Sequence, residues 1–182
     1  MLKPKFVSFK VDGYKGLAFY DYDEFIKKQI YLYKGCFDYE MKDVFLNLFI
    51  KEIKLYYRGY TIIPVPSYQK DDEIRGFNHV VEVYKSLDLK MLPIIVKTSH
   101  FKQAENNAKT RQDIKKHLAL KEQVDFSKTR VLLVDDIYTT GSTIRASIKL
   151  LEKLNPKEIK VLVLAKTKDK DYKKPNTNIS LH

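Results

Sequence analysis

The sequence of 182 residues contains a single cysteine, Cys36, and no tryptophan. One cysteine excludes a disulfide within the chain and a zinc site built from several cysteines. The longest aliphatic runs, residues 131–134 and 161–165, are much shorter than the roughly 20 apolar residues needed to cross a bilayer. The first residues also lack the apolar stretch of a secretory signal peptide. We therefore expect a cytoplasmic protein without membrane insertion.

Positive charge predominates: 34 lysines and arginines stand against 23 aspartates and glutamates, which gives a net charge of +11. Such an excess favours anionic partners, including nucleotides, phosphorylated sugars and nucleic-acid backbones. A lysine-rich composition that only keeps the protein in solution explains the charge equally well. The 44% of hydrophobic residues is enough for a folded core, and the length fits one ordinary domain.

The pattern of apolar residues predicts an α/β fold with a parallel sheet flanked by helices and a small N-terminal α+β appendage. The appendage, or hood, is expected over residues 1–60, the core over 61–166 and a basic, flexible tail over 167–182. Strands are expected at residues 16–22, 61–65, 92–96, 131–134 and 159–165. Helices are expected after Asp23 and at residues 39–57, 77–87 and 142–154, with a further helical stretch in the second half of residues 105–120.

The segment VLLVDDIYTTGST, residues 131–143, carries the clearest chemical signal. Its buried strand leads to Asp135 and Asp136, whose carboxylates can accept hydrogen bonds from a sugar diol. A turn then leads into a helix, whose N-terminal amides form a natural phosphate site. Gly141 allows close approach of the backbone, and further donors come from hydroxyl groups. These features together predict a ribose-5-phosphate site, with the hydroxyls of Thr139, Thr140, Ser142 and Thr143.

Other interpretations of this segment are weaker. A Walker-type phosphate loop requires a lysine that is missing here. A response-regulator receiver domain also has a strand that leads into two aspartates, but those end its first strand, whereas here they lie three-quarters of the way along the chain. In the simplest alternative, Asp135 and Asp136 are solvated charges and Ser142 is an ordinary helix cap.

VLLVDDIYTTGST resembles the signature by which type I phosphoribosyltransferases bind 5-phosphoribosyl-1-diphosphate (PRPP). The resemblance implies that Asp135 and Asp136 contact the ribose hydroxyls. It also implies a Mg²⁺ cofactor that takes most of its ligands from PRPP and water, with Asp135 and Asp136 as the only candidate protein ligands. The 5-phosphate would be bound by Thr139, Thr140, Gly141, Ser142 and Thr143.

Two further segments resemble the ComF family, in matching order with the PRPP signature from about residue 62 to 165. They are Pro64-Val65-Pro66 followed by Arg75-Gly76-Phe77-Asn78, and Lys97-Thr98 followed by Gln103 and Arg111. Arginine donors at these places suit diphosphate oxygens, and residues 99–111 are a candidate mobile flap. Surface ion pairs or solvated lysines are the alternative. The diphosphate-binding candidates are Pro66, Ser67, Arg75, Lys97, Lys102 and Arg111.

The sequence also departs from the family pattern. ComF members usually carry an N-terminal four-cysteine zinc element, which this chain cannot form. His79 replaces the glutamine that follows Arg-Gly-Phe-Asn, and we interpret it as structural. Acidic residues 71–73 replace the usual basic residues and weaken a case for DNA binding by that loop. Thr139 stands where enzymes of 6-oxopurine salvage have an acid, which makes hypoxanthine–guanine salvage a poor prediction.

The resemblance leaves two functions open. One is a Mg²⁺-dependent phosphoribosyltransferase, a glycosyltransferase that moves ribose-5-phosphate from PRPP to an unknown acceptor. The other is a factor for DNA uptake in natural competence, which binds PRPP and single-stranded DNA, works with other competence proteins and has little or no transferase activity. A positive groove with tyrosines and phenylalanines would suit single-stranded DNA.

Overall fold

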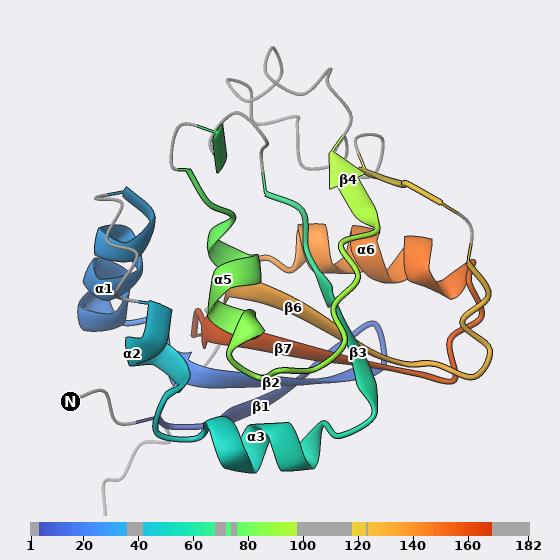
Figure 1. Ribbon diagram of the computed structural model, residues 1–182. Helices are drawn as coiled ribbons and strands as arrows, with labels where there is room; N and C mark the ends of the chain where they lie inside the picture. The colour runs from blue at the N-terminus through green and yellow to red at the C-terminus, as the bar shows by residue number, and fades with distance from the viewer. Residues whose placement is uncertain are drawn as a thin grey trace, which may run out of the picture.

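The computed structural model of the protein describes residues 4–35, 42–67, 72–73, 76–97, 118–122 and 124–168, and a five-stranded sheet lies at its centre (Figure 1). The spatial order of the strands is β1-β2-β7-β6-β3. β2, β7, β6 and β3 run parallel, and β1 pairs antiparallel with β2. Their bounds are β1 Val7–Val11, β2 Tyr14–Asp21, β3 Tyr60–Pro64, β6 Arg130–Tyr138 and β7 Glu158–Lys166.

Helices cover both faces of this sheet, and two hydrophobic clusters fill the spaces between the layers (Figure 1). Along β6, Leu132 and Val134 belong to one cluster and Val131 and Leu133 to the other, which explains the unbroken apolar run. The first cluster includes residues of α1 (Glu24–Gly35), α2 (Lys42–Leu46), α3 (Ile50–Tyr56) and α5 (His79–Lys85). The second includes residues of α6 (Ser142–Glu152), β4 (Ile95–Lys97) and β5 (Leu118–Leu120), the last two forming a small antiparallel sheet. The predicted α/β class is confirmed.

The N-terminal segment joins the central sheet. A tight turn at Asp12 and Gly13, both with positive φ, connects β1 and β2 into a hairpin, of which the sequence predicts only the second strand. Asp23 caps α1, since its Oδ1 accepts a hydrogen bond from the amide of Ile26 at 2.9 Å. β2 lies between β1 and β7, so part of the expected appendage extends the core sheet. The division at residues 60 and 166 stays a prediction.

Some predicted elements differ from the structure. The single helix expected over residues 39–57 is two short helices, α2 and α3, because Phe49 leaves the helical region with a φ of −131°. Residues 118–120 form strand β5, not the end of a helix, because they pair with β4. The rest of that expected helix, residues 39–41 and the tail beyond residue 168 lie outside the described residues.

Two expectations bear directly on function. β6 continues through both aspartates to Tyr138, where the sequence predicts a strand of four residues. Helix α6 starts at Ser142, as predicted. Among the helices of the described segments, none combines the length and the apolar character that a bilayer crossing requires.

Candidate functional site

The carboxyl ends of four parallel strands, β2, β7, β6 and β3, meet at one edge of the sheet. Ligands of open α/β sheets bind at this edge. β6 brings Asp135 and Asp136 to it, and the turn at residues 139–141 leads directly into α6. The edge therefore places carboxylates next to the N-terminus of a helix, as the sequence predicts.

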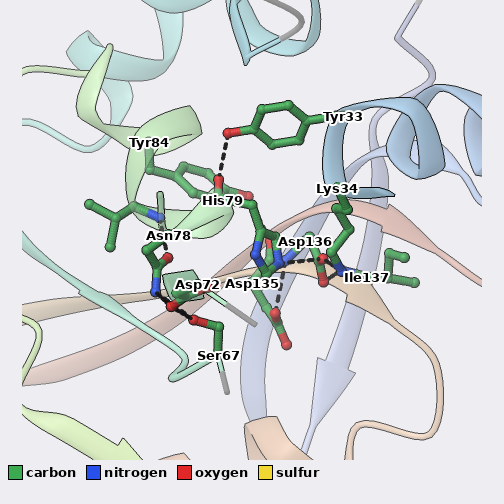
Figure 2. A network of polar contacts seen from close by, with 11 residues as sticks. Tyr33, Lys34, Ser67, Asp72, Asn78, His79, Tyr84, Asp135, Asp136 and Ile137 are labelled. Carbon is green, nitrogen blue, oxygen red and sulfur yellow. Dashed lines mark hydrogen bonds and ion pairs between the residues drawn. The ribbon is translucent and has the colours of Figure 1, made fainter. Parts of the chain in front are cut away.

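The carboxylate of Asp136 contacts two side chains from different helices, Lys34 and His79. Its side chain forms an ion pair with Lys34 of α1, and its Oδ2 lies 2.9 Å from Nε2 of His79 at the start of α5 (Figure 2). The residue is only 8% exposed. Burial alone would raise the pKa of Asp136, but the ammonium of Lys34 and the hydrogen bond to His79 outweigh it and hold the pKa well below its usual range. Asp136 is thus a fixed negative charge.

The pKa of Asp135 is shifted in the opposite direction, upward. Its carboxylate Oδ1 accepts a hydrogen bond from the amide of Asp136 at 2.9 Å, and its carbonyl oxygen accepts one from the hydroxyl of Tyr84 at 2.9 Å. The residue is half-buried. Burial, with the nearby charge of Asp136, raises the pKa of Asp135 well above its ordinary value. The two neighbouring carboxyl groups therefore differ in charge preference, and Asp135 is the one that more readily takes up a proton.

The turn after β6 exposes polar groups at the start of α6. Gly141 adopts a left-handed conformation with a φ of +70°. The hydroxyl oxygens of Thr140 and Ser142 lie 2.8 Å apart and share a hydrogen bond. Thr139 and Thr140 are exposed and Thr143 is half-buried. An 11-residue helix that starts behind such a turn offers amide donors and a positive dipole end to an anion.

Arg145 adds a guanidinium group that sequence reasoning missed. It donates to the carbonyl oxygen of Thr140, and its Nε lies 3.2 Å from Oδ1 of Asp12 in the β1–β2 turn. Arg145 lies one helical turn after Gly141, and its backbone amide donates a hydrogen bond to the carbonyl oxygen of Gly141. The sequence could have identified Arg145, since the helix predicted from residue 142 places this arginine beside the phosphate turn.

Lys34 and His79 are the other residues that sequence reasoning did not connect with the acidic pair. Lys34 lies about a hundred positions from Asp136, in α1, and nothing in the sequence links the two. His79 is buried, and its backbone carbonyl accepts a hydrogen bond from Tyr33 at 2.9 Å. Its predicted structural role agrees with these contacts, but it also touches a predicted ribose-binding carboxylate.

The predicted diphosphate-binding residues are only partly described. Pro66 and Ser67 follow β3 at the ligand edge of the sheet. The Ser67 hydroxyl donates to Asp72 and accepts from Nδ2 of Asn78 at 2.6 Å, and Oδ1 of Asn78 caps α5 through the amide of Val81 (Figure 2). Lys97 ends β4, in register with Leu118 of the small sheet. Arg75, Lys102 and Arg111 lie outside the described residues.

Comparisons with known proteins identify the class to which this fold and site belong. The family described as Phosphoribosyl transferase domain matches residues 74–180, more than half of the chain. The chain therefore belongs to the phosphoribosyl transferase domain family. It also resembles competence protein ComFC of Streptococcus pneumoniae, with 29% identity over 85% of this chain and 69% of that protein. Competence protein F of Haemophilus influenzae is 40% identical over 58% of this chain and 49% of that protein.

The similarity to these two competence proteins agrees with the resemblance to the ComF family that the sequence motifs indicated. The aligned region spans about half of the Haemophilus protein's length. Solved structures that match part of the chain include a hypoxanthine phosphoribosyltransferase from Staphylococcus aureus, with 13% identity, a TM-score of 0.43 and coverage of 69% of this chain and 62% of that one. Another is a purine phosphoribosyltransferase from Pyrococcus horikoshii, with 19% identity, a TM-score of 0.43 and coverage of 69% and 72%.

Proposed function

We propose that the protein binds Mg²⁺–PRPP at the carboxyl end of β6 and transfers its ribose-5-phosphate to an acceptor. One observation carries the proposal: β6 delivers Asp135 and Asp136 to the same edge at which the turn of residues 139–141 opens the N-terminus of α6. Carboxylates suit a sugar diol and helix N-terminal amides suit a phosphate. The carboxylates would face the diol of a phosphorylated pentose, and the helix N-terminus would face its 5-phosphate.

Each part of the site has a role in this proposal. The hydroxyls of Thr139, Thr140, Ser142 and Thr143 and the backbone around Gly141 bind the 5-phosphate. Arg145, which contacts the carbonyl of Thr140, braces the turn and adds positive charge beside it. Asp136 and Asp135 accept hydrogen bonds from the ribose hydroxyls. For the diphosphate we propose Pro66, Ser67 and Lys97, together with Arg75, Lys102 and Arg111.

Lys34 and His79 prepare Asp136 for this role. They keep its carboxylate ionised before the ligand arrives, and an ionised acceptor makes stronger hydrogen bonds to hydroxyl groups than a neutral one. Because Lys34 is partly exposed, with 30% of its side chain accessible, its ammonium can turn toward an incoming anion without unfolding α1. His79 is buried and stays behind the carboxylate as its fixed partner.

The donor set near β6 fits a magnesium ion that is bound mainly by PRPP. Within the described residues no group of three or more histidine, cysteine, aspartate or glutamate side chains could enclose a metal. Two carboxylates are available, and Mg²⁺ commonly keeps several waters and substrate phosphate oxygens among its six ligands. When bound, the ion would neutralise the departing diphosphate. Asp135 and Asp136 are the residues that would contact it.

The transfer needs positioning and charge stabilisation more than a strong protein base. In the transition state, positive charge develops on the sugar as the diphosphate leaves, and fixed carboxylates beside the ribose stabilise that charge. Asp136 supplies the permanent charge in this arrangement, because its pKa is lowered. The reaction must be sealed from water, and the flap predicted for residues 99–111 lies outside the described residues.

A turnover screen tests this function. We expect the purified chain with Mg²⁺–PRPP to release diphosphate faster when one fraction of a metabolite pool is added, since only the true acceptor completes the reaction. Diphosphate release is measured with a coupled phosphatase assay. The Asp135→Asn/Asp136→Asn double variant serves as the control for contaminating activity. Release that stays at the level of this variant with every fraction would contradict the transferase.

A second candidate function, handling of single-stranded DNA during competence in the cytoplasm, draws support from one surface feature. At the end of the sheet opposite the ligand edge, the ammonium of Lys160 lies 5.1 Å from the ring centres of both Tyr56 and Tyr60. Arg130 lies 4.8 Å from the ring centre of Tyr60. Tyr56 is 66% exposed and beside it Leu55 is 72% exposed. Tyr60 is buried, so Tyr56 is the ring that is open to solvent here, and an exposed aromatic ring next to a cation is typical of surfaces on which unpaired bases stack.

Replacing Tyr56 by alanine tests the DNA-binding candidate. We expect the affinity for a poly-dT oligonucleotide to fall by about tenfold, because stacking on one ring contributes about 1–3 kcal/mol. Fluorescence anisotropy at several salt concentrations measures it, and the affinity should fall steeply with salt. Tyr31→Ala is a matched control, since Tyr31 is also 66% exposed. Equal affinities of both variants, or binding that ignores salt, would argue against this function.

A further inference from the structure

The carbonyl oxygens at the end of β6 and in the turn after it are held by two residues from separate elements. The backbone amide of Thr167, just beyond β7, donates a hydrogen bond to the carbonyl oxygen of Tyr138 at 3.0 Å. The hydroxyl of Thr167 lies 3.4 Å from the carbonyl oxygens of both Tyr138 and Thr139. In α6, the guanidinium of Arg145 donates to the carbonyl oxygen of Thr140. Three consecutive carbonyl groups are therefore anchored to the body of the protein.

The anchored carbonyl groups fix the direction in which the amides of this turn point. The described peptide bonds are all trans, and in a trans peptide the N–H and the C=O of one unit point in opposite directions. The same three peptide units carry the amides of Thr139, Thr140 and Gly141, none of which donates a hydrogen bond to another described residue. Because the carbonyl oxygens point toward the protein, these N–H groups point away from it, as binding of an anion requires.

The β1–β2 hairpin holds Arg145 in place. Nε of Arg145 lies 3.2 Å from Oδ1 of Asp12 in the hairpin turn, and its Nη2 lies 3.5 Å from the hydroxyl oxygen of Tyr138. The Tyr138 ring in turn packs against the ring of Phe9 in β1, with 4.6 Å between the ring centres. A guanidinium presents its donors in a rigid fork, so the contact with Asp12 also sets the direction of the donor to Thr140. The hairpin thus contacts both ends of the turn's support, through Asp12 and Phe9.

We propose that Asp12, Arg145 and Thr167 are positioning residues for the 5-phosphate, which set the direction of the amides at residues 139–141. The β1–β2 hairpin thereby determines how tightly a sugar phosphate binds. This inference rests on the proposed function, and it gives Arg145 a role that depends on the shape of its side chain. Positive charge alone would give Arg145 a different role, the attraction of a phosphate, in which a lysine serves equally well and the charge of Asp12 opposes binding. The two roles predict different results for the same variants.

Calorimetry of the full chain with ribose 5-phosphate and with Mg²⁺–PRPP separates the two roles. In Arg145→Lys the affinity for both ligands should fall by about fivefold or more, because an ammonium keeps the charge but cannot contact Thr140 and Asp12 together. In Asp12→Gly we expect a fall of about threefold, since an exposed ion pair contributes little except through the direction of the guanidinium. If charge alone mattered, Arg145→Lys would bind normally and Asp12→Gly would bind more tightly.

Asp88→Gly is the matched control for Asp12→Gly. Asp12 and Asp88 have nearly the same positive φ, 48° and 49°, which glycine adopts without strain. Each forms an ion pair at the surface, Asp12 with Arg145 at 3.2 Å and Asp88 with Lys54 at 2.6 Å. Asp88→Gly therefore removes an equivalent carboxylate that has no contact with the turn after β6, and it should bind both ligands as the unchanged protein does.

Thr167→Val and Thr167→Ser test the second anchor. Valine keeps the shape of the side chain and the backbone amide but removes the hydroxyl, so the affinity for ribose 5-phosphate should fall by about threefold. Serine retains the hydroxyl and should retain the affinity. Urea unfolding of each variant provides the comparison, since a merely structural role would make the affinity follow the free energy of unfolding and not the presence of the hydroxyl.

Normal binding of both ligands by Arg145→Lys, or tighter binding by Asp12→Gly, would overturn the inference. So would a loss of affinity that Asp88→Gly reproduces. A loss for Mg²⁺–PRPP that ribose 5-phosphate does not share would also overturn it, because the defect would then lie at the diphosphate. Failure of the proposed function is distinguishable: it appears as an unchanged protein that binds neither ligand, whereas failure of this inference appears only in variants of a protein that binds both.

Discussion

Asp136→Asn is expected to lower both the stability of the fold and the affinity for Mg²⁺–PRPP. The substitution keeps the shape of the side chain but removes the negative charge that Lys34 and His79 surround. Loss of one partner of a buried ion pair costs about 3–5 kcal/mol. Because Lys34 is partly exposed, we expect Asp136→Asn to lower the free energy of unfolding by about 2–3 kcal/mol. Urea unfolding at pH 7 measures the stability. Calorimetry should show an affinity for Mg²⁺–PRPP reduced by about tenfold or more, since a hydrogen bond to a charged group contributes about 1.5–3 kcal/mol.

The neighbouring substitution, Asp135→Asn, is the matched control for stability and should not destabilise the fold. Burial and the charge of Asp136 disfavour an ionised Asp135, so a neutral amide removes a repulsion. The asparagine oxygen can still accept the hydrogen bond from the amide of Asp136. We expect the free energy of unfolding at pH 7 to stay constant or rise by up to about 1 kcal/mol. If both variants lose the same stability, the assignment of unequal roles to the two carboxyl groups is wrong.

Acid titration separates the two aspartates further. The lowered pKa of Asp136 contributes stability that is present above the ordinary pKa of 3.8 and is lost as the pH falls below it. The stability difference between the unchanged protein and Asp136→Asn should therefore shrink below about pH 4. For Asp135 the sign reverses: its raised pKa makes the folded protein lose stability as the pH rises above 3.8. The advantage of Asp135→Asn should therefore grow with pH.

Gly141→Ala should damage the phosphate turn. Gly141 has a φ of +70°, and a Cβ atom there would lie 2.5 Å from the hydroxyl oxygen of Tyr138 and 2.6 Å from its Cζ. The Tyr138 ring cannot easily move away, because it is buried and its centre lies 4.6 Å from that of Phe9. We expect stability to fall by about 2–3 kcal/mol, from backbone strain and overpacking together. Calorimetry should show Mg²⁺–PRPP binding weakened by at least about tenfold, because the amides at the start of α6 are displaced.

Gly13→Ala is a suitable control for the stability that is lost through backbone strain alone. Gly13 also has a positive φ, +90°, but a Cβ atom there would meet no other atom within 4 Å. This variant should lose only about 1 kcal/mol of stability, from strain alone, and bind Mg²⁺–PRPP normally. A Gly141→Ala protein that binds Mg²⁺–PRPP as well as Gly13→Ala does would contradict a phosphate role for this turn.

The sequence predicted those features that depend on short-range patterns. The unbroken apolar run of residues 131–134 predicted a strand buried on both faces, and Ser142 marked the start of α6. The order of acids, turn and helix identified the candidate site because all of these parts lie within thirteen consecutive residues. The cap at Asp23 was equally local.

Long-range contacts were beyond sequence reasoning. Lys34 meets Asp136 only because α1 packs over the face of the sheet to which Asp136 belongs, and no periodicity encodes that approach. The sequence also does not predict the contact of Tyr84, whose hydroxyl donates a hydrogen bond from α5 to the carbonyl oxygen of Asp135. β6 exceeds its predicted length because its pairing with β7 continues to Lys166. The β5 error has the same origin, since Leu118–Leu120 is a strand only through its partner β4.

The end of β6 and the start of α6 are proposed to bind a phosphorylated ribose. A crystal structure of the protein with Mg²⁺ and PRPP tests it most directly. We expect the 5-phosphate within hydrogen-bond distance of the backbone amides of residues 139–143, with the ribose hydroxyls against Asp135 and Asp136. PRPP bound at any other place, or absent from crystals grown with saturating ligand, would contradict it.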